Sequence, residues 1–281
     1  MNSPAPRPEI PTRLLVDALV REDGTVVAEE LYTVAGRLGM TDQQVRLCLR
    51  RLVAEGRFTQ QGRGRKARIR AVADPTDSFA PDAEHVRYAY RQDAGLAPWD
   101  GTWHLFAFAV PETRRTARDT LRTTLLHLGA APVQGGLYVC ANPIADLVET
   151  HARALGVHES LTSLTSTDLR IGDLRDPRAL AASLWPLDDL AAGHTRLATY
   201  AEQCLTELDH DSSPTRLTLA VTLAAEFDRA HTPDPLLPPQ LLPEDWPGAR
   251  ARALTRACWQ RLDAGTGTMP RLFTLYRNAS D

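Results

Sequence analysis

Polar and basic side chains gather on one face of a predicted helix between residues 41 and 54. Apolar side chains recur at helical spacing on its other face: Val45, Leu49, Leu52 and Val53, with Cys48 beside them. The free face carries Gln43, Arg46, Leu47 and Arg50. Arg can bond guanine bidentately, Gln can pair with adenine, and Leu can touch a thymine methyl group. This face therefore favours the reading of base edges in duplex DNA.

Three residues of this stretch have more than one interpretation. Leu47 fits a thymine contact and packing against another helix or a dimer partner equally well. Arg51 is placed to meet a DNA phosphate or to pair with Glu55, four residues on. Gln44, three residues after Thr41, completes a capping box, and it is also included among the expected DNA contacts.

A basic hairpin is predicted directly after the helix. Gly56 can end the helix with a positive φ, and Gly62 and Gly64 supply a turn. Beyond the turn, cations alternate with smaller or apolar residues with a period of two, which is typical of a half-buried strand: Lys66, Arg68 and Arg70 with Ala67, Ile69 and Ala71. We expect contacts to the DNA backbone or minor groove from Arg63, Arg65, Lys66 and Arg68.

The charge of the chain is unevenly distributed. Residues 43–70 contain nine Lys and Arg residues and one acid, a net charge of +8, whereas the whole chain has a net charge of −3. A basic run is usually a solvated face. Here it is concentrated on one small region of an otherwise acidic protein, which indicates contact with phosphates.

Composition excludes several classes of protein. No run of 18 apolar residues is present, so no transmembrane span is expected, and the N-terminal MNSPAPRPEIP has no apolar core for a secretory signal. The four cysteines are scattered without CxxC spacing. This argues against a zinc site and against disulfides, and it suits a reducing cytoplasm, where the protein is expected to associate with the nucleoid.

The 281 residues are long enough for several domains, and the pattern predicts an α+β fold. We expect a loose arm over 1–11, a winged helix-turn-helix over 12–72, a linker over 73–98, a central domain over 99–172 and a helical domain over 173–281. The central block runs in the order strand, helix, two strands, helix, strand. That order is typical of a ferredoxin-like βαββαβ domain.

Signatures of catalysis are weak. The sequence has no HExxH, no Gly-x-Ser-x-Gly elbow and no P-loop, and no catalytic residue, metal ligand or cofactor is expected. His104, Tyr138 and Cys140 lie within predicted strands and are interpreted as packing residues. We therefore expect no enzymatic activity.

Three blocks, taken in order, resemble the PaaX-like family of transcriptional repressors, which control bacterial phenylacetic acid catabolism. The first is VRLCLRRLVAEGRFTQQGRGRKARIRAV, the second is WHLFAFAVPETRRTARDTLRTTLLHLGAAPVQGGLYVCANP, and the third and most specific is DPLLPPQLLPEDWPG from Asp234. The resemblance covers about Thr12 to Leu262. It implies a cytoplasmic homodimer that binds a palindromic operator and is released by an effector such as an aryl-acyl-CoA thioester. A DNA-binding protein without an effector remains the alternative.

The central block also looks like the small nuclease-fold protein of CRISPR adaptation modules. A metal-dependent nuclease of that kind needs an aspartate at the end of its first strand, because Mg²⁺ takes carboxylate ligands. Here that strand ends Phe108-Ala109-Val110-Pro111-Glu112, without an aspartate. Nuclease activity is therefore disfavoured.

Two groups of residues are candidates for an effector site. Arg114, Arg118 and Arg122 recur every four residues on one predicted helix and could hold the phosphates of a CoA-like ligand. They could equally form a solvated face, a dimer surface or a second DNA contact. Trp99 and Trp103 flank a domain junction, where ligand pockets often form, although ordinary packing is the favoured interpretation.

Overall fold

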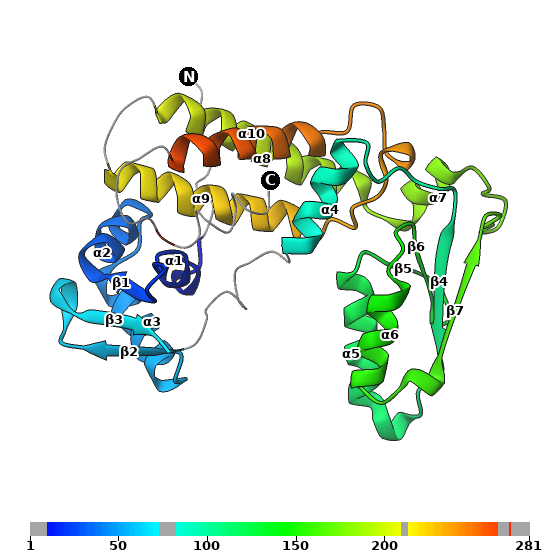
Figure 1. Ribbon diagram of the computed structural model, residues 1–281, viewed down its shortest axis with the longest axis horizontal. Helices are drawn as coiled ribbons and strands as arrows, with labels where there is room; N and C mark the ends of the chain where they lie inside the picture. Colours follow the sequence, from blue (N-terminus) through cyan, green and yellow to red (C-terminus); the bar gives the residue numbers. More distant parts are fainter. Residues whose placement is uncertain (1–9, 73–82, 209–212, 264–269, 271–281) are drawn as a thin grey trace. The chain divides into compact units, whose positions relative to one another are not determined.

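The computed structural model describes residues 10–72, 83–208, 213–263 and 270 (Figure 1). Contacts divide the chain into two compact units. The first unit comprises residues 1–87, 194–229 and 248–281, and the second comprises residues 88–193 and 230–247. Nearly all of the expected N-terminal arm, 1–11, and the part of the linker before residue 83 lie outside the described residues.

The first unit begins with three helices and a three-stranded sheet. The elements are α1 (Thr12–Ala18), β1 (Thr25–Val27), α2 (Ala28–Arg37), α3 (Asp42–Ala54), β2 (Phe58–Gln61), the 3-10 turn η1 (Gly64–Lys66) and β3 (Arg68–Ala71). The sheet has the order β1-β3-β2, and both strand pairs are antiparallel. The helices and hairpin agree with the sequence prediction. Strand β1 was missed, because three residues are too few to show a period.

The start of α3 has the cap that the sequence predicts. Thr41 Oγ1 accepts a hydrogen bond from the Gln44 backbone N–H at 3.2 Å, and the Gln44 side chain accepts one from the Thr41 N–H at 2.7 Å. This satisfies two backbone donors that a helix otherwise leaves unpaired. Gly56, after the helix, has a φ of 73°, a conformation that costs glycine little.

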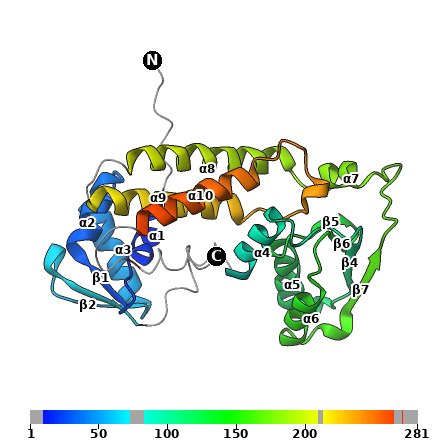
Figure 2. The same cartoon turned by 45° about the horizontal axis from the view of Figure 1, so that its top comes forward.

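Three long helices complete the first unit. These are α8 (Leu187–Glu207) from His194 onward, α9 (Ser213–His231) up to Arg229, and α10 (Gly248–Asp263). Figures 1 and 2 show them lying side by side. Cys258 on α10 donates to the Ala201 carbonyl on α8 at 3.2 Å, and both side chains are fully buried.

The second unit contains a four-stranded antiparallel sheet in the order β5-β6-β4-β7. Its elements are α4 (Ala83–Asp93) from Tyr88 onward, β4 (Trp103–Phe108), α5 (Arg115–His127), β5 (Ala131–Gln134), β6 (Leu137–Cys140), α6 (Ala145–Ala154), β7 (Leu161–Ser166) and α7 (Pro177–Leu184). From β4 to β7 the order of strands and helices is the predicted one. Helices α5 and α6 cover one face of the sheet, where Phe106, Tyr138 and Cys140 are buried with Leu121 and Val148 (Figure 1).

The other face of this sheet is covered by residues from much later in the chain. Trp103 and Leu105 pack there with Leu180 of α7 and with Leu237 and Leu241. This is why the second unit includes residues 230–247, and why its bounds differ from the expected division at residue 172.

The segment at Pro235 and Leu236 is held by buried amide side chains. Asn142 Nδ2 donates to the carbonyls of Pro235 and Leu236 at 3.1 and 2.9 Å, and Gln92 Nε2 donates to the Leu236 carbonyl at 2.9 Å. Leu236 has a φ of 51°, which is uncommon for a residue with a side chain. A Cβ at Gly129 would lie 2.6 Å from the Pro235 oxygen, so only glycine fits there.

Within the described part of the chain, no helix combines the length and apolarity needed to cross a bilayer.

Candidate nucleic-acid interface

The free face of α3 is exposed, as the sequence predicts. Val45, Leu49 and Leu52 are at most 1% exposed. The side chains that were expected to meet DNA bases are all exposed: Gln43, Arg46, Leu47 and Arg50. Leu47 is 40% exposed, so it does not pack against another helix of the described structure, and the thymine and dimer interpretations both stay open.

Val53 differs from the expectation for α3, and the structure adds detail at Gln44 and Arg51. Val53 is 38% exposed rather than buried, because it lies about 80° around the helix from Val45, at the border of the apolar face. The Gln44 amide oxygen accepts hydrogen bonds in the cap at Thr41, as the capping box predicts, while the side chain stays exposed. Glu55 pairs with Arg13 at 3.2 Å, and Arg51 remains exposed.

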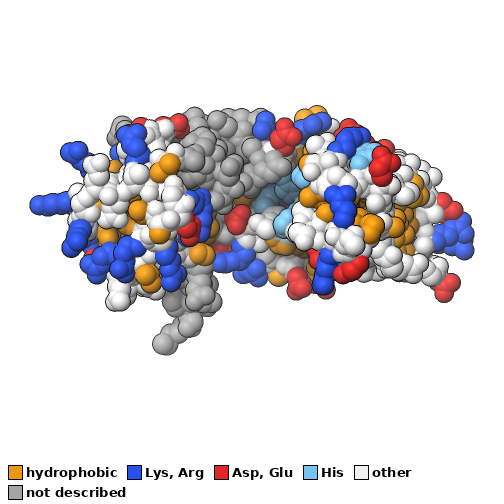
Figure 3. All heavy atoms as spheres, turned by 90° about the horizontal axis from the view of Figure 1, so that it is seen from below, with side chains coloured by type: hydrophobic (Ala, Val, Ile, Leu, Met, Phe, Trp, Pro, Cys, Tyr) orange, Lys and Arg blue, Asp and Glu red, His pale blue; other side chains and the backbone are white. Residues whose placement is uncertain are grey.

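The hairpin exposes several cations around its turn. Arg63, Lys66 and Arg68 are exposed, and the described residues offer none of them an ion pair. In β3, Arg68 and Arg70 point to the outer face of the sheet, while Ile69 between them is 2% exposed. Lys and Arg side chains gather over this region at the left of Figure 3.

The outer face of the sheet is hollowed. A depression of about 470 Å³ is lined by residues of all three strands and by the cations Arg65, Lys66, Arg68 and Arg70. Glu29 is the only acid among its lining residues. The surface is therefore attractive to anions such as phosphates.

Arg65 is engaged within the unit rather than free. Its Nη1 donates to Thr33 Oγ1 at 3.3 Å, and its Nη2 lies 3.9 Å from Asp42 Oδ1. Its guanidinium carbon lies 5.6 Å from the centre of the Tyr32 ring. Arg65 therefore differs from Arg63, Lys66 and Arg68 in having partners within the unit, while its side chain remains 51% exposed.

A buried acid near the interface was missed by the sequence reasoning. The side chain of Asp17 in α1 is 1% exposed, and neither of its oxygens accepts a hydrogen bond from the described residues. Burial raises its pKa to about 6, although the cations Arg57, at 3.9 Å, and Arg13 act in the opposite direction. No signal marks Asp17 in the sequence, because an acid on a short helix is usually solvent-exposed.

Comparison with known proteins gives two matches that cover the chain beyond the hairpin. Residues 96–181 match the PaaX protein central Cas2-like domain, and residues 185–269 match the PaaX-like protein C-terminal domain. The chain belongs to the PaaX-like family. This confirms the resemblance, and it points to transcriptional regulation and DNA binding in general.

Other comparisons add little to this assignment. No curated protein matches the sequence. A solved structure, the uncharacterized protein Rv0674 from Mycobacterium tuberculosis, is similar over 90% of this chain and 95% of that chain, with 23% sequence identity and a TM-score of 0.49.

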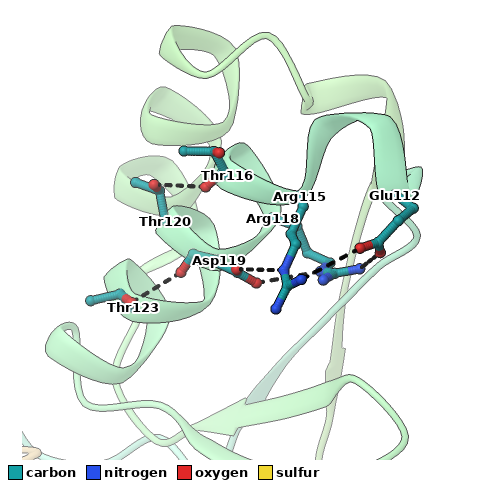
Figure 4. Close-up of polar contacts among 7 residues, drawn as sticks. All are labelled: Glu112, Arg115, Thr116, Arg118, Asp119, Thr120 and Thr123. Carbon is teal, nitrogen blue, oxygen red and sulfur yellow. Dashed lines mark hydrogen bonds and ion pairs between the residues drawn. The ribbon is translucent and has the colours of Figure 1, made fainter.

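The arginines suggested as an effector site in this PaaX-like protein do not form a stripe. Arg114 lies in a 3-10 turn before α5, and its guanidinium donates to the carbonyls of Leu155 and Gly156 at the end of α6. Arg118 pairs with Glu112 at 2.7 Å (Figure 4). Of the three, only Arg122 is exposed without such a partner in the described structure.

The two tryptophans form part of the core of the second unit. Trp103 is 2% exposed. The centre of its ring lies 5.2 Å from that of Trp99 and 6.4 Å from that of Trp185. The Trp99 indole N–H donates to the Thr102 carbonyl at 3.0 Å. Trp103 is therefore a packing residue rather than an effector contact, and Trp99 is only partly accessible.

The other residues considered for chemistry are also placed in ordinary packing. Cys140 is fully buried, and burial raises the pKa of its thiol to about 12. Partial burial lowers the pKa of His104, against the opposing effect of Asp100. Among the residues that the structure describes, no group of three or more His, Cys, Asp and Glu side chains could hold a metal ion.

Proposed function

We propose that this protein is a sequence-specific DNA-binding transcriptional regulator whose first unit acts as a winged helix-turn-helix. The observation that carries the proposal is the division of α3 into a buried apolar face and an exposed face with Gln43, Arg46 and Arg50, next to a basic hairpin. An ordinary solvated helix would not need a cationic β-ribbon beside its exposed face. Helices of this kind place their N-terminal residues against base edges in the major groove.

The parts of the surface divide into two roles. Arg46 and Arg50 can bond guanine O6 and N7, Gln43 can pair with adenine, and Leu47 can meet a thymine methyl group. Arg63, Lys66 and Arg68 supply phosphate contacts that position the helix without reading sequence. Membership of the PaaX-like family supports the regulatory role.

The finer features of the proposal come from the family resemblance. These are a homodimer on a palindromic operator, repression, and release by an effector such as an aryl-acyl-CoA. We also propose a ferredoxin-like central domain, from the order of its strands and helices, and no enzymatic activity, because the sequence lacks catalytic motifs. We place the effector site in the second unit, whose sheet has the strand order β5-β6-β4-β7. Its site would involve residues other than Trp103, Arg114 and Arg118, whose side chains are already engaged.

Operator binding tests the main proposal. A mobility-shift titration on the protein's own promoter should show binding that weakens with added salt. Arg50→Ala should cost about 1–3 kcal/mol of binding free energy at one base position. Arg122→Ala, which removes an exposed arginine from the second unit, serves as the matched control and should bind as the parent does. Equal affinity and selectivity for Arg50→Ala and the parent would refute the assignment of α3.

Repeating the titration with a panel of acyl-CoAs separates a ligand-released repressor from an effector-independent DNA-binding protein. Release by one thioester supports the first, and indifference to all of them supports the second. Incubation with Mg²⁺ or Mn²⁺ and with single- and double-stranded DNA tests the remaining nuclease alternative, since cleavage would contradict a purely regulatory role.

A further inference from the structure

The turn of the hairpin is tethered to the start of α3 through one side chain. Arg65, in the middle of the 3-10 turn Gly64–Lys66, reaches Thr33 on α2 and Asp42 in the first turn of α3. It also lies over the face of Tyr32, which is 2% exposed. One guanidinium therefore contacts three residues on two helices outside its own hairpin.

The local geometry suits a tether. Thr33 Oγ1 donates its own proton to the Glu29 carbonyl at 2.7 Å, which leaves its lone pairs free to accept from Arg65 at 3.3 Å. A planar guanidinium can bond a hydroxyl, face a carboxylate and stack on an aromatic ring at the same time, which a lysine ammonium cannot do. The Tyr32 ring, fixed in the core, gives the contact a rigid base.

The turn needs such a tether because its backbone is permissive. Gly62 and Gly64 flank Arg63 with φ values of 85° and 64°, and a Cβ at Gly64 would meet nothing within 4 Å. Glycines in this region leave the chain free to move unless side chains hold it. The exposed cations Arg63 and Lys66 lie on either side of Arg65, so their position relative to α3 depends on this turn.

We propose that Arg65 is a positioning residue, which fixes the hairpin turn beside the N-terminal end of α3 so that its cations and the base-reading face engage one duplex together. This rests on the proposed DNA-binding function and revises the role of Arg65 from a phosphate contact to a tether. The distinction is testable because a phosphate contact depends on charge, whereas a tether depends on the contacts to Thr33, Asp42 and Tyr32.

The first experiment compares charge with geometry. If Arg65 only neutralises a phosphate, Arg65→Lys should bind duplex DNA almost as the parent does, and Arg65→Ala should make the negative slope of log K against log salt shallower by about 0.9. The tether predicts that both variants weaken binding by a similar factor, roughly three- to tenfold. Full retention of affinity by Arg65→Lys would overturn the proposal.

The second experiment changes Asp42, a partner of Arg65. A phosphate contact and a tether predict opposite changes in DNA affinity for this variant. Asp42→Asn removes a negative charge close to DNA, so electrostatics alone predicts tighter binding, whereas loss of the tether predicts weaker binding. Glu29→Gln is the matched control, because it removes an exposed first-turn acid from α2 that does not pair with Arg65. Tighter binding by both variants would contradict the tether.

A third variant avoids any change of charge or of the first turn of α3. Thr33→Val keeps the shape of the side chain and removes the oxygen that accepts from Arg65. It should weaken binding, and it should add little further loss in the Arg65→Ala background, because the two residues act through one contact. Additive losses would indicate that Arg65 and Thr33 act separately and would overturn the proposal.

A measurement without DNA keeps the two proposals distinguishable. Hydrogen exchange at the amides of residues 62–66 should become faster in Arg65→Ala and in Thr33→Val, and remain as in the parent in Glu29→Gln. If neither the parent nor any variant binds duplex DNA but hydrogen exchange responds in this way, the tether stands and the proposed function fails. Unchanged exchange in Arg65→Ala rejects the tether whatever the DNA result.

Discussion

Two regions of this protein are rich in basic residues but differ in the acids that surround them. Around the hairpin of the first unit, Arg63, Lys66 and Arg68 are exposed and are offered no ion pair by the residues that the structure describes. Around α5 of the second unit, Arg115 and Arg118 lie close to Glu112 and Asp119 (Figure 4). The first set is available to an outside anion, and the second is largely neutralised by its own neighbours.

The difference depends on the nearby acids and not on the arginines themselves. Residues 43–70 include a single acid, Glu55, which pairs with Arg13 rather than with a hairpin cation. Helix α5 carries Asp119 four residues after Arg115, a spacing that places opposite charges together on a helix surface. The count of unpaired cations is therefore a better guide to a phosphate-binding surface than the count of arginines.

The largest expected effect is on the salt dependence of DNA binding. The triple variant Arg63→Ala, Lys66→Ala, Arg68→Ala should make the negative slope of log K against log salt shallower by roughly 2.7 and weaken binding about 10²-fold at physiological salt. The control is Arg115→Ala, Arg118→Ala, Arg122→Ala, which removes the same charge from α5 and should change the slope little. Similar losses in the two triple variants, measured by fluorescence anisotropy, would erase the contrast between the regions.

The next effect concerns the stability of the second unit. Arg114 donates to two carbonyls at the end of α6, Leu155 and Gly156, which have no further helical partner. Arg114→Ala should lower the free energy of unfolding by about 1–2 kcal/mol, because charge-assisted hydrogen bonds to those carbonyls are lost. DNA affinity should stay as in the parent. Urea unfolding measures the stability, and fluorescence anisotropy measures the DNA affinity. A loss of affinity without a loss of stability would place Arg114 at a DNA contact.

Arg114 also shows what sequence reasoning could not supply. The repeat of Arg114, Arg118 and Arg122 assumes one continuous helix from Glu112, whereas the structure starts with a 3-10 turn and begins α5 at Arg115. This change in winding turns Arg114 toward α6. Partners such as Leu155, 41 residues away, depend on tertiary packing that no local pattern records.

The elements with strong local signals were predictable. Thr41 and Gln44 fixed the start of α3, Gly56 its end, and Gly135-Gly136 the turn between β5 and β6. The second unit was harder to predict, because one face of its sheet is covered by Leu237 and Leu241 from a segment far along the chain. Helical spacing was enough to predict that the free face of α3 is exposed. The contact between Arg65 and Thr33 could not be predicted in this way, because Thr33 lies 32 residues before Arg65.

Asp17, a buried acid in the first unit, gives an effect of similar size with a defined sign. Burial raises the pKa of Asp17 from 3.8 to about 6, so the folded chain binds a proton more tightly than the unfolded chain does. The free energy of unfolding should therefore fall as the pH rises from about 4 to 6, by about 1–2 kcal/mol, and level off above that range. Asp17→Asn should remove this part of the profile, which chemical unfolding from about pH 4.5 to about pH 7.5 measures. An unchanged profile in the variant would show that another group is responsible.

The smallest expected effect lies at Arg122, the arginine of the α5 series that is exposed without a partner in the described structure. Surface substitutions away from specific contacts change stability by about 0.5 kcal/mol or less, so Arg122→Ala should unfold as the parent does. If Arg122 nevertheless belongs to an effector site, the variant should need a higher concentration of the active acyl-CoA for operator release while its DNA affinity without ligand is unchanged. If the ligand concentration needed for release is also unchanged, Arg122 belongs to a solvated face. The effector site would then involve none of the three arginines of the series, because Arg114 already bonds the end of α6 and Arg118 already pairs with Glu112.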